Sequence, residues 1–347
     1  MNNIIPKLIG EINSCRIQEP INKEIYSNNN GKGINEMLFF IKPELTEQSV
    51  SLDFESIYQM IFSKIDEYDF HIKNIRIINA SYLDKYDIIA KHYGVINTVS
   101  RDPKNTIGDA AKLEFKKSFN IEFDYANIIG SLELLSTLPG LQVEELHKIW
   151  TKNEMHKLGG GIYCAKCTIN SSEYYVFNGF HPLQIKHFTA PGKVIVAITL
   201  TGNCSWSDAR RNFIGSTNPE NASNDSIRSI LYSKMKDWRI PKISYSYNGA
   251  HLSAGPIEGL IELIRYNTVC TKNSVHKPVY DFQNQLQEEF GVEIFNKIME
   301  NPTIIYNENP TSVFDLTEEM NSDVAIETLK KVNWNQLSVR KKVKIES

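Results

Sequence analysis

Hydrophobic and polar positions alternate with two different periods along the chain, and each change of period marks a new element. Residues 37–41 form a short apolar run typical of a buried strand, and residues 72–78 alternate as a second strand. Between them, apolar side chains at 54, 57, 58, 61, 62 and 65 follow helical spacing. Two more strands are predicted at 194–199 and 243–247, with helices expected at 207–214 and 256–266. This order predicts a ferredoxin-like α+β fold, an antiparallel sheet with helices on one face.

The segments outside this alternation suggest how the chain is organised. Residues 1–36 hold few apolar periodicities and are expected to form an N-terminal segment, before a domain at 37–266. Within that domain, residues at about 97–189 interrupt the pattern with expected helices at 125–135 and 143–155 and a hairpin at 162–177. A large inserted α+β segment is therefore predicted there. Residues 267–347 are expected to form a helical C-terminal extension, because an apolar stripe recurs every four residues from 282 to 298.

Composition narrows the class of protein and its partners. The 347 residues are 41% hydrophobic and 23% charged, which is typical of a soluble globular protein. A net charge of −3 gives no general reason to expect nucleic acid or an anionic membrane as a partner. No apolar run approaches the length of a membrane span. Five sparsely placed cysteines favour a reducing compartment, so a cytoplasmic location is expected.

Cys164 and Cys167 form a Cys-x-x-Cys pair, which can supply half of a zinc site. No second pair of this kind exists in the sequence, and the first lies in a predicted hairpin strand. Structural thiols are therefore favoured over a metal, whose remaining ligands would have to come from Cys204, Cys270, His181 and His187.

The candidate chemistry centres on His251, which we expect at the junction between the strand at 243–247 and the loop after it. Ser253 follows two residues later, and Glu262 lies on the helix expected at 256–266, so that both can reach the ring. A carboxylate or hydroxyl that orients an imidazole leaves the other ring nitrogen able to attack. Taken alone, a histidine near a strand end is more often structural, so the context must decide.

Cationic residues elsewhere provide what a polyphosphate requires. Arg211 stands just before a Gly-Ser-Thr-Asn-Pro turn that contains Thr217, and Arg228 follows that turn. Far upstream, Lys42 ends the apolar strand at 37–41. Such residues offer fixed donors and positive charge to oxygens that gain charge during transfer.

In this order, the motifs resemble those of the nucleoside diphosphate kinases. They are Ile-Lys-Pro-Glu at 41–44, His-Tyr at 92–93, Arg-x-x-x-Gly-x-Thr-Asn-Pro at 211–219, Ile-Arg at 227–228 and Asn-x-x-His-x-Ser at 248–253, followed by a helical glutamate. The resemblance covers about 37–96 and 190–266, under half of the chain. It implies a ping-pong reaction in which His251 takes the terminal phosphoryl of ATP or another nucleoside triphosphate. The phosphohistidine then passes it to a nucleoside diphosphate or a related specialised acceptor.

The resemblance also implies roles for individual residues. Glu262 and Ser253 match the groups that orient His251, and Lys42 joins them in catalysis. Phosphate and ribose contacts are implied for Lys42, Tyr93, Arg211, Thr217, Arg228 and Asn248. Mg²⁺ is implied on the nucleotide phosphates with few or no protein ligands. A homo-oligomer is implied as well, because members of the family are usually multimers.

Departures from the family leave several points open. Asn224-Asp225-Ser226 replaces the Pro-Gly that precedes the family's arginine, so Arg239 is a substitute for Arg228 to test. The segment at about 97–189 stands where the family has its base-clamping helical hairpin. It either rebuilds the acceptor side of the site or forms an outward decoration or oligomer contact. The alternative function is a catalytically silent nucleotide-binding regulatory or structural protein of the same fold, although such a protein would not need the nucleophile.

Overall fold

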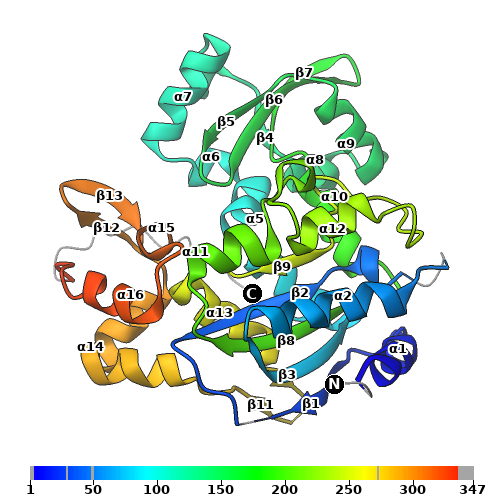
Figure 1. Cartoon of the computed structure of the whole chain (residues 1–347). Coiled ribbons are helices and arrows are strands. Elements are labelled where there is room, and N and C mark those ends of the chain that lie inside the picture. Colours follow the sequence, from blue (N-terminus) through cyan, green and yellow to red (C-terminus); the bar gives the residue numbers. More distant parts are fainter. Residues whose placement is uncertain (1–3, 29, 48–50, 272, 335–347) are drawn as a thin grey trace. The chain divides into compact units, whose positions relative to one another are not determined.

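The computed structural model describes residues 4–28, 30–47, 51–271 and 273–334, and it divides into two compact units (Figure 1). Unit 1 comprises Met1–Asn79 and Val194–Ser347, and unit 2 comprises Ala80–Lys193. Residues 335–347, the end of the expected C-terminal extension, lie outside the described residues. Among the described helices, none is both long and apolar enough to cross a membrane.

Unit 1 is built on a five-stranded sheet with the order β1-β3-β8-β2-β9, in which all neighbouring strands are antiparallel. With the edge strand β1 set aside, the other four have the strand order of a ferredoxin-like fold, with β8 inserted between β2 and β3. The predicted α+β class and ferredoxin-like arrangement are therefore confirmed. The strands are β1 (Asn22–Ser27), β2 (Asn35–Ile41), β3 (His71–Asn79), β8 (Val194–Gly202) and β9 (Ala250–Leu252).

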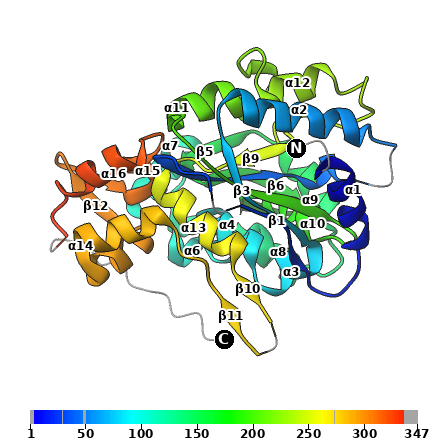
Figure 2. The ribbon, with the colours of Figure 1, turned by 60° about the horizontal axis from the view of Figure 1, so that its bottom comes forward.

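Helices cover both faces of this sheet rather than one, as Figure 2 shows. Phe39 and Ile41 of β2 enter an apolar core shared with the helices on one face. These are α1 (Ile4–Ser14), α2 (Phe54–Glu67), α11 (Trp206–Asp208) with a π-helical turn at Ala209–Ile214, and α12 (Ile227–Ser233). On the other face, Tyr266 of α13 (Pro256–Asn267) stacks on Phe40 at 5.4 Å between ring centroids. Because both faces are covered, every residue of β2 is buried, which accounts for its unbroken apolar run.

The N-terminal residues contribute regular structure that was not expected. Leu8 and Ile12 of α1 are one helical turn apart and fully buried in the core of unit 1. β1 pairs with β3 and becomes one edge of the sheet. Ile4, Ile5 and Ile9 pack against the same core, so the apolar residues of α1 follow helical spacing after all. A helix of 11 residues is marginal alone, and tertiary packing supplies most of its stability.

The strand predicted at 243–247 is wrong. Ser244 N donates to Tyr247 O at 3.0 Å, which closes a turn across this segment. The strand forms three residues later, as β9, where Leu252, His251 and Ala250 pair with residues 39–41 of β2. Apolar and polar residues do alternate over 243–247, but the backbone N–H of Ser244 and the carbonyl of Tyr247 bond to each other in a turn instead of to a neighbouring strand.

Unit 2 contains a four-stranded sheet with the order β4-β7-β6-β5, in which β4 is parallel to β7 and the other pairs are antiparallel. The predicted hairpin is confirmed as β6 and β7, whereas the helix expected at 125–135 is replaced by β4 and then α8. The strands are β4 (Ile128–Gly130), β5 (Met155–Gly159), β6 (Ile162–Ile169) and β7 (Ser172–Phe177). The helices are α3 (Ala80–Lys85), α4 (Ile88–His92), α5 (Gly94–Arg101), α6 (Pro103–Thr106), α7 (Asp109–Phe119), α8 (Ser131–Thr137), α9 (Val143–Thr151) and α10 (His181–Thr189).

The C-terminal part of unit 1 mixes helices with two short hairpins. The long helix α14 (Asp281–Met299) follows the predicted apolar stripe and is interrupted at Gly291, where φ is 71°. The other helices are α15 (Val313–Thr317) and α16 (Ser322–Leu329), and the hairpins pair β10 (Val269–Cys270) with β11 (Val275–His276) and β12 (Thr303–Tyr306) with β13 (Asn309–Ser312). Glu319 N donates to Ala254 O at 2.9 Å, so this region is tied to the segment that follows β9.

Candidate active site

His251 lies inside β9, the edge strand beside β2, rather than in a loop. It stands opposite Phe40, and the two rings stack with centroids 4.5 Å apart and planes inclined by 19°. Successive side chains of a strand point to opposite faces. Ala250 and Leu252 therefore enter the apolar core, while His251 lies on the face that carries α13. Its side chain is 17% exposed, which leaves part of the ring accessible to a ligand.

A glutamate and a serine hold this ring. The Glu262 carboxylate, 1% exposed on α13, accepts from His251 Nε2 at 3.0 Å and from Ser253 Oγ at 2.6 Å. Ser253 Oγ in turn accepts from the backbone N–H of Leu38 at 3.1 Å. α13 begins with Pro256 directly after Gly255, where an added Cβ would meet Thr317 O at 2.7 Å. The structure thus brings together His251, the predicted nucleophile, with the two residues that the sequence predicted to orient it.

The direction of the Glu262 bond decides which ring nitrogen can react. An ionised carboxylate only accepts hydrogen bonds, so Nε2 carries the proton and Nδ1 keeps the lone pair of a neutral imidazole. The carboxylate also stabilises positive charge that would build up on the ring when Nδ1 attacks. This arrangement suits nucleophilic catalysis by Nδ1.

Lys42 belongs to a second, adjoining cluster. Its Nζ donates to Asn248 Oδ1 at 2.6 Å, and Asn248 Nδ2 donates to Thr217 O at 3.0 Å. The buried Glu44 carboxylate accepts from Gly249 N at 2.8 Å, which fixes the backbone next to Asn248. Burial lowers the pKa of Lys42 to about 8, although the Glu44 carboxylate opposes this change. The cluster therefore joins three predicted site residues, and its lysine changes charge within reach of physiological pH.

Two arginines bind the outer edge of β9. Arg228 Nη1 donates to Gly215 O at 2.8 Å, and its Nη2 donates to Ala250 O at 3.0 Å. Arg210 Nη1 donates to Leu252 O at 3.0 Å. Arg228 is buried, and its positive charge further lowers the pKa of Lys42, whose largest perturbation is burial. These bonds fix the backbone on both sides of His251.

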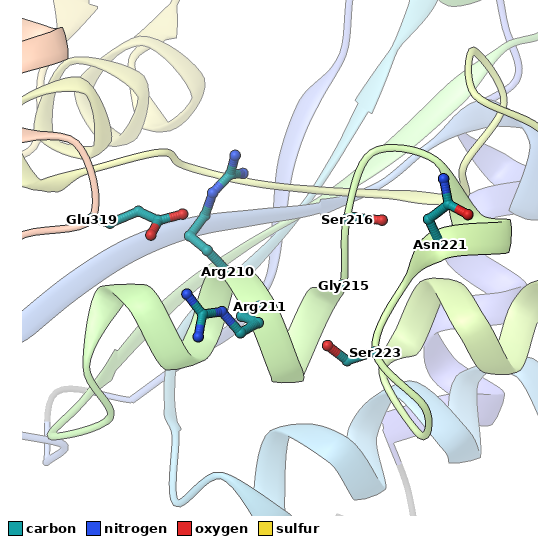
Figure 3. A pocket seen from close by; sticks show the side chains of 7 residues that line it. All are labelled: Arg210, Arg211, Gly215, Ser216, Asn221, Ser223 and Glu319. Carbon is teal, nitrogen blue, oxygen red and sulfur yellow. The ribbon is translucent and has the colours of Figure 1, made fainter.

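The other predicted phosphate contacts lie in different surroundings. Arg211 and Thr217 are exposed, and Arg211 lines a pocket with Arg210 (Figure 3). Tyr93 belongs to unit 2, between α4 and α5, where its ring meets that of His181 edge-on. Arg239 donates to Ser51 Oγ at 3.2 Å near the start of α2, so Arg228 is the arginine joined to β9.

Cys164 and Cys167 lie in β6 of unit 2 as buried free thiols. Burial raises the pKa of Cys167 to about 11 and that of Cys164 well above its usual range. Zinc binds thiolates, so these environments oppose ligation by this pair.

Sequence reasoning missed Phe40 and Glu44, and it counted Arg210 among the cations near the turn without foreseeing its contact with β9. Phe40 lies two residues before Lys42 on a predicted strand, so period-two alternation could have placed both on one face. Glu44 was part of the Ile-Lys-Pro-Glu motif, but no pattern indicated that its carboxylate binds Gly249 N. The bond of Arg210 to β9 depends on long-range packing and has no sequence signal.

No protein-family model matches the chain, and no curated protein matches its sequence. Among solved structures, nucleoside diphosphate kinase from Encephalitozoon cuniculi is 13% identical, with 72% of this chain and 97% of that one covered at a TM-score of 0.34. The Aquifex aeolicus nucleoside diphosphate kinase is 13% identical, with 70% and 99% covered and a TM-score of 0.34. An NDP kinase from Pyrobaculum aerophilum is 14% identical, with 69% and 97% covered and a TM-score of 0.32.

Proposed function

We propose that the protein is a phosphotransferase that moves the γ-phosphoryl of a nucleoside triphosphate through a phosphohistidine at His251. The observation that carries the proposal is the hydrogen-bonded chain from Ser253 through Glu262 to His251 Nε2. A histidine that only filled the core would not need a buried carboxylate that fixes its proton. The partly accessible ring and the nearby lysine cluster support the same reading.

The first step forms one bond and breaks another. His251 Nδ1 attacks the γ-phosphorus, a P–N bond forms, and the bond to the oxygen bridging to the β-phosphate breaks, so the nucleoside diphosphate leaves with that electron pair. In the second step, an oxygen of the acceptor attacks the phosphorus, and Nδ1 leaves as neutral imidazole. Glu262 keeps the proton on Nε2 in both steps, so the ring can gain and lose positive charge without releasing that proton.

Electrostatic stabilisation comes from cations beside the strand. Phe40 pairs with His251, and Lys42 follows Phe40 by two residues, so their Cα atoms are about 7 Å apart in extended backbone. In this proposal, the Lys42 ammonium group therefore reaches phosphate oxygens near His251. Lys42 and Arg228 stabilise charge on the transferred group, and Mg²⁺ enters with the nucleotide as part of the substrate. The family resemblance adds Tyr93, Arg211, Thr217 and Asn248 as contacts for phosphate and ribose.

The acceptor in this proposal is a nucleoside diphosphate or a related specialised metabolite. The resemblance also suggests a homo-oligomer. A nucleotide-binding regulatory protein of the same fold would bind ATP without forming the covalent intermediate, which gives the experiment a clear alternative outcome.

Incubation with γ-labelled ATP and Mg²⁺ tests the proposal directly. We expect an acid-labile, base-stable label on the wild-type chain and none on His251→Ala. His276→Ala is the matched control, because His276 is an exposed histidine of unit 1 on β11, and it should label fully. Full labelling of His251→Ala would assign the nucleophile elsewhere, and ATP binding without any label would favour the regulatory protein.

A further inference from the structure

A pocket of about 260 Å³ in unit 1 is lined by polar and charged residues together with Gly215. Figure 3 shows two arginines and a glutamate on one side and two serines and an asparagine on the other. The residues are Arg210, Arg211, Ser216, Asn221, Ser223 and Glu319. The pocket shares no residue with the Ser253–Glu262–His251 chain or with the Lys42–Asn248 cluster, but it contains Arg211, which the family resemblance also assigns to the nucleotide phosphates.

Several donors in this pocket are not committed to the protein itself. Within the described part of the chain, the side chains of Arg211, Asn221 and Ser223 make no hydrogen bond or ion pair. Arg210 uses Nη1 on Leu252 O, whereas its buried Nε has no hydrogen-bond partner among the described residues. Buried polar groups are normally satisfied, so the buried Nε of Arg210 points to a missing acceptor, and the more accessible side chains of Arg211, Asn221 and Ser223 are available to bind it.

The charge balance favours an anion. Two guanidinium groups face one carboxylate, that of Glu319. Arg210 also faces Glu258, whose pKa is raised by burial and by the neighbouring Glu262 carboxylate. This shift weakens the negative charge that Glu258 can offer to Arg210 on that side. Guanidinium groups bind phosphate oxygens in a bidentate manner, with more geometric specificity than a lysine provides.

Backbone geometry shapes the pocket and connects it to β9. Gly215 has φ of 87°, and a Cβ there would meet Ser226 Oγ at 2.4 Å and Ala222 Cβ at 2.9 Å. Gly215 O accepts from Arg228, and Glu319 N is bound to Ala254 O. Glu319 itself has φ of 58°, an unfavourable value for a residue with a side chain, and this conformation brings its carboxylate to the pocket.

We propose that this pocket is a binding site for a small phosphate monoester that also carries a hydroxyl or amino group. The arginines, Asn221 and Ser223 bind the phosphate, and the Glu319 carboxylate accepts a hydrogen bond from the ligand's hydroxyl or amine. A ligand here would sit against the Gly215 loop, which Arg228 joins to Ala250 beside His251. The site stands whether or not His251 carries a phosphoryl group.

Calorimetric titration of the full chain with glycerol 2-phosphate and with methyl phosphate tests the site. We expect saturable binding of both, with glycerol 2-phosphate tighter because only it offers a hydroxyl group to Glu319. The variant Asn221→Asp places a like charge beside the phosphate and should weaken both ligands at least about tenfold. The matched control is Asn224→Asp, which adds the same charge at an exposed position outside the pocket and should bind like wild type.

Further variants separate the parts of the proposal. Glu319→Gln should reduce the preference for glycerol 2-phosphate over methyl phosphate, and Arg211→Gln should weaken both. His251→Ala should bind glycerol 2-phosphate like wild type, so that failure of this site and failure of the phosphohistidine are measured independently. An absence of saturable binding to the wild-type chain, or equal affinity in folded Asn221→Asp and Arg211→Gln proteins, would overturn the inference. Circular dichroism confirms that each variant is folded.

Discussion

Replacement of Glu262 by glutamine perturbs the proposed nucleophile with almost no change in shape. The carboxylate accepts from His251 Nε2 at 3.0 Å and from Ser253 Oγ at 2.6 Å, and it is almost completely buried. Hydrogen bonds to a charged group contribute about 1.5–3 kcal/mol, against about 0.5–1.5 kcal/mol for neutral pairs. The bond to His251 therefore loses about 1–1.5 kcal/mol, which is on the order of a tenfold decrease in rate.

The orientation of the new amide can only add to this loss. If the glutamine NH₂ group faces His251, Nε2 must accept and the proton moves to Nδ1, which removes the attacking lone pair. We therefore expect phosphoenzyme formation in Glu262→Gln to slow by at least about tenfold. Rapid-quench measurement of label transfer from γ-labelled ATP, at saturating nucleotide, reports this step directly. A wild-type rate in Glu262→Gln would refute the proposed role of the carboxylate, even if His251→Ala remained unlabelled.

Ser253→Ala provides a contrast within the same chain of hydrogen bonds. Its Oγ accepts from the buried Leu38 N–H, so truncation leaves that donor unsatisfied at a cost of about 1–3 kcal/mol in unfolding free energy. Glu262 keeps its charge and its bond to the ring in this variant. The bond from Leu38 N is lost in Ser253→Ala but kept in Glu262→Gln. Ser253→Ala should therefore carry this loss of stability, which Glu262→Gln does not, while it slows phosphorylation less than Glu262→Gln does. Urea unfolding and the same quench assay measure the two effects.

Two further predictions concern Lys42 and Gly215. The pKa of Lys42 falls from 10.5 to about 8 on folding, so the unfolded chain binds more protons between these values and stability should rise with pH across that window. Phosphorylation should fall as the pH rises through about 8, where Lys42 of the folded protein loses its charge. In Lys42→Met, the contribution of Lys42 to both trends should be absent, as measured by urea unfolding and by labelling at each pH. Gly215→Ala combines a φ of 87° with a Cβ 2.4 Å from Ser226 Oγ, so it should destabilise unit 1 by about 1–3 kcal/mol. In thermal melts, Gly10→Ala in α1 should instead be neutral or stabilising, because nothing lies within 4 Å of the added Cβ.

The positions of three strands were predictable because they depend on patterns that are local. The apolar runs at 37–41, 72–78 and 194–199 lie within β2, β3 and β8, and helical spacing located α2 between the first two. β9 was misplaced because its three residues are too few to show a period, whereas the preceding alternation closes into a turn. Short edge strands depend on a partner strand, which a local window does not contain.

The site was predictable where residues act within one stretch of chain. His251, Ser253 and Glu262 are eleven residues apart at most, and they meet because a strand leads directly into a helix. The partners of Lys42 could not be found in this way, because Asn248 is 206 positions away in sequence. The pocket around Arg211 could not be predicted either, because Glu319 lies more than 100 residues later in the sequence, outside every motif that contains Arg211.

The arginines on the outer side of β9 have a consequence for how this protein behaves at high concentration. A strand at the margin of a sheet offers its backbone to any other polypeptide that can lie alongside, which is a common route to fibrils. Here the carbonyl groups of Ala250 and Leu252 already accept from Arg228 and Arg210. A foreign strand would have to displace two charged donors before it could add there. The protein can therefore keep His251, the proposed nucleophile, on its edge strand without exposing that edge to pairing with other chains.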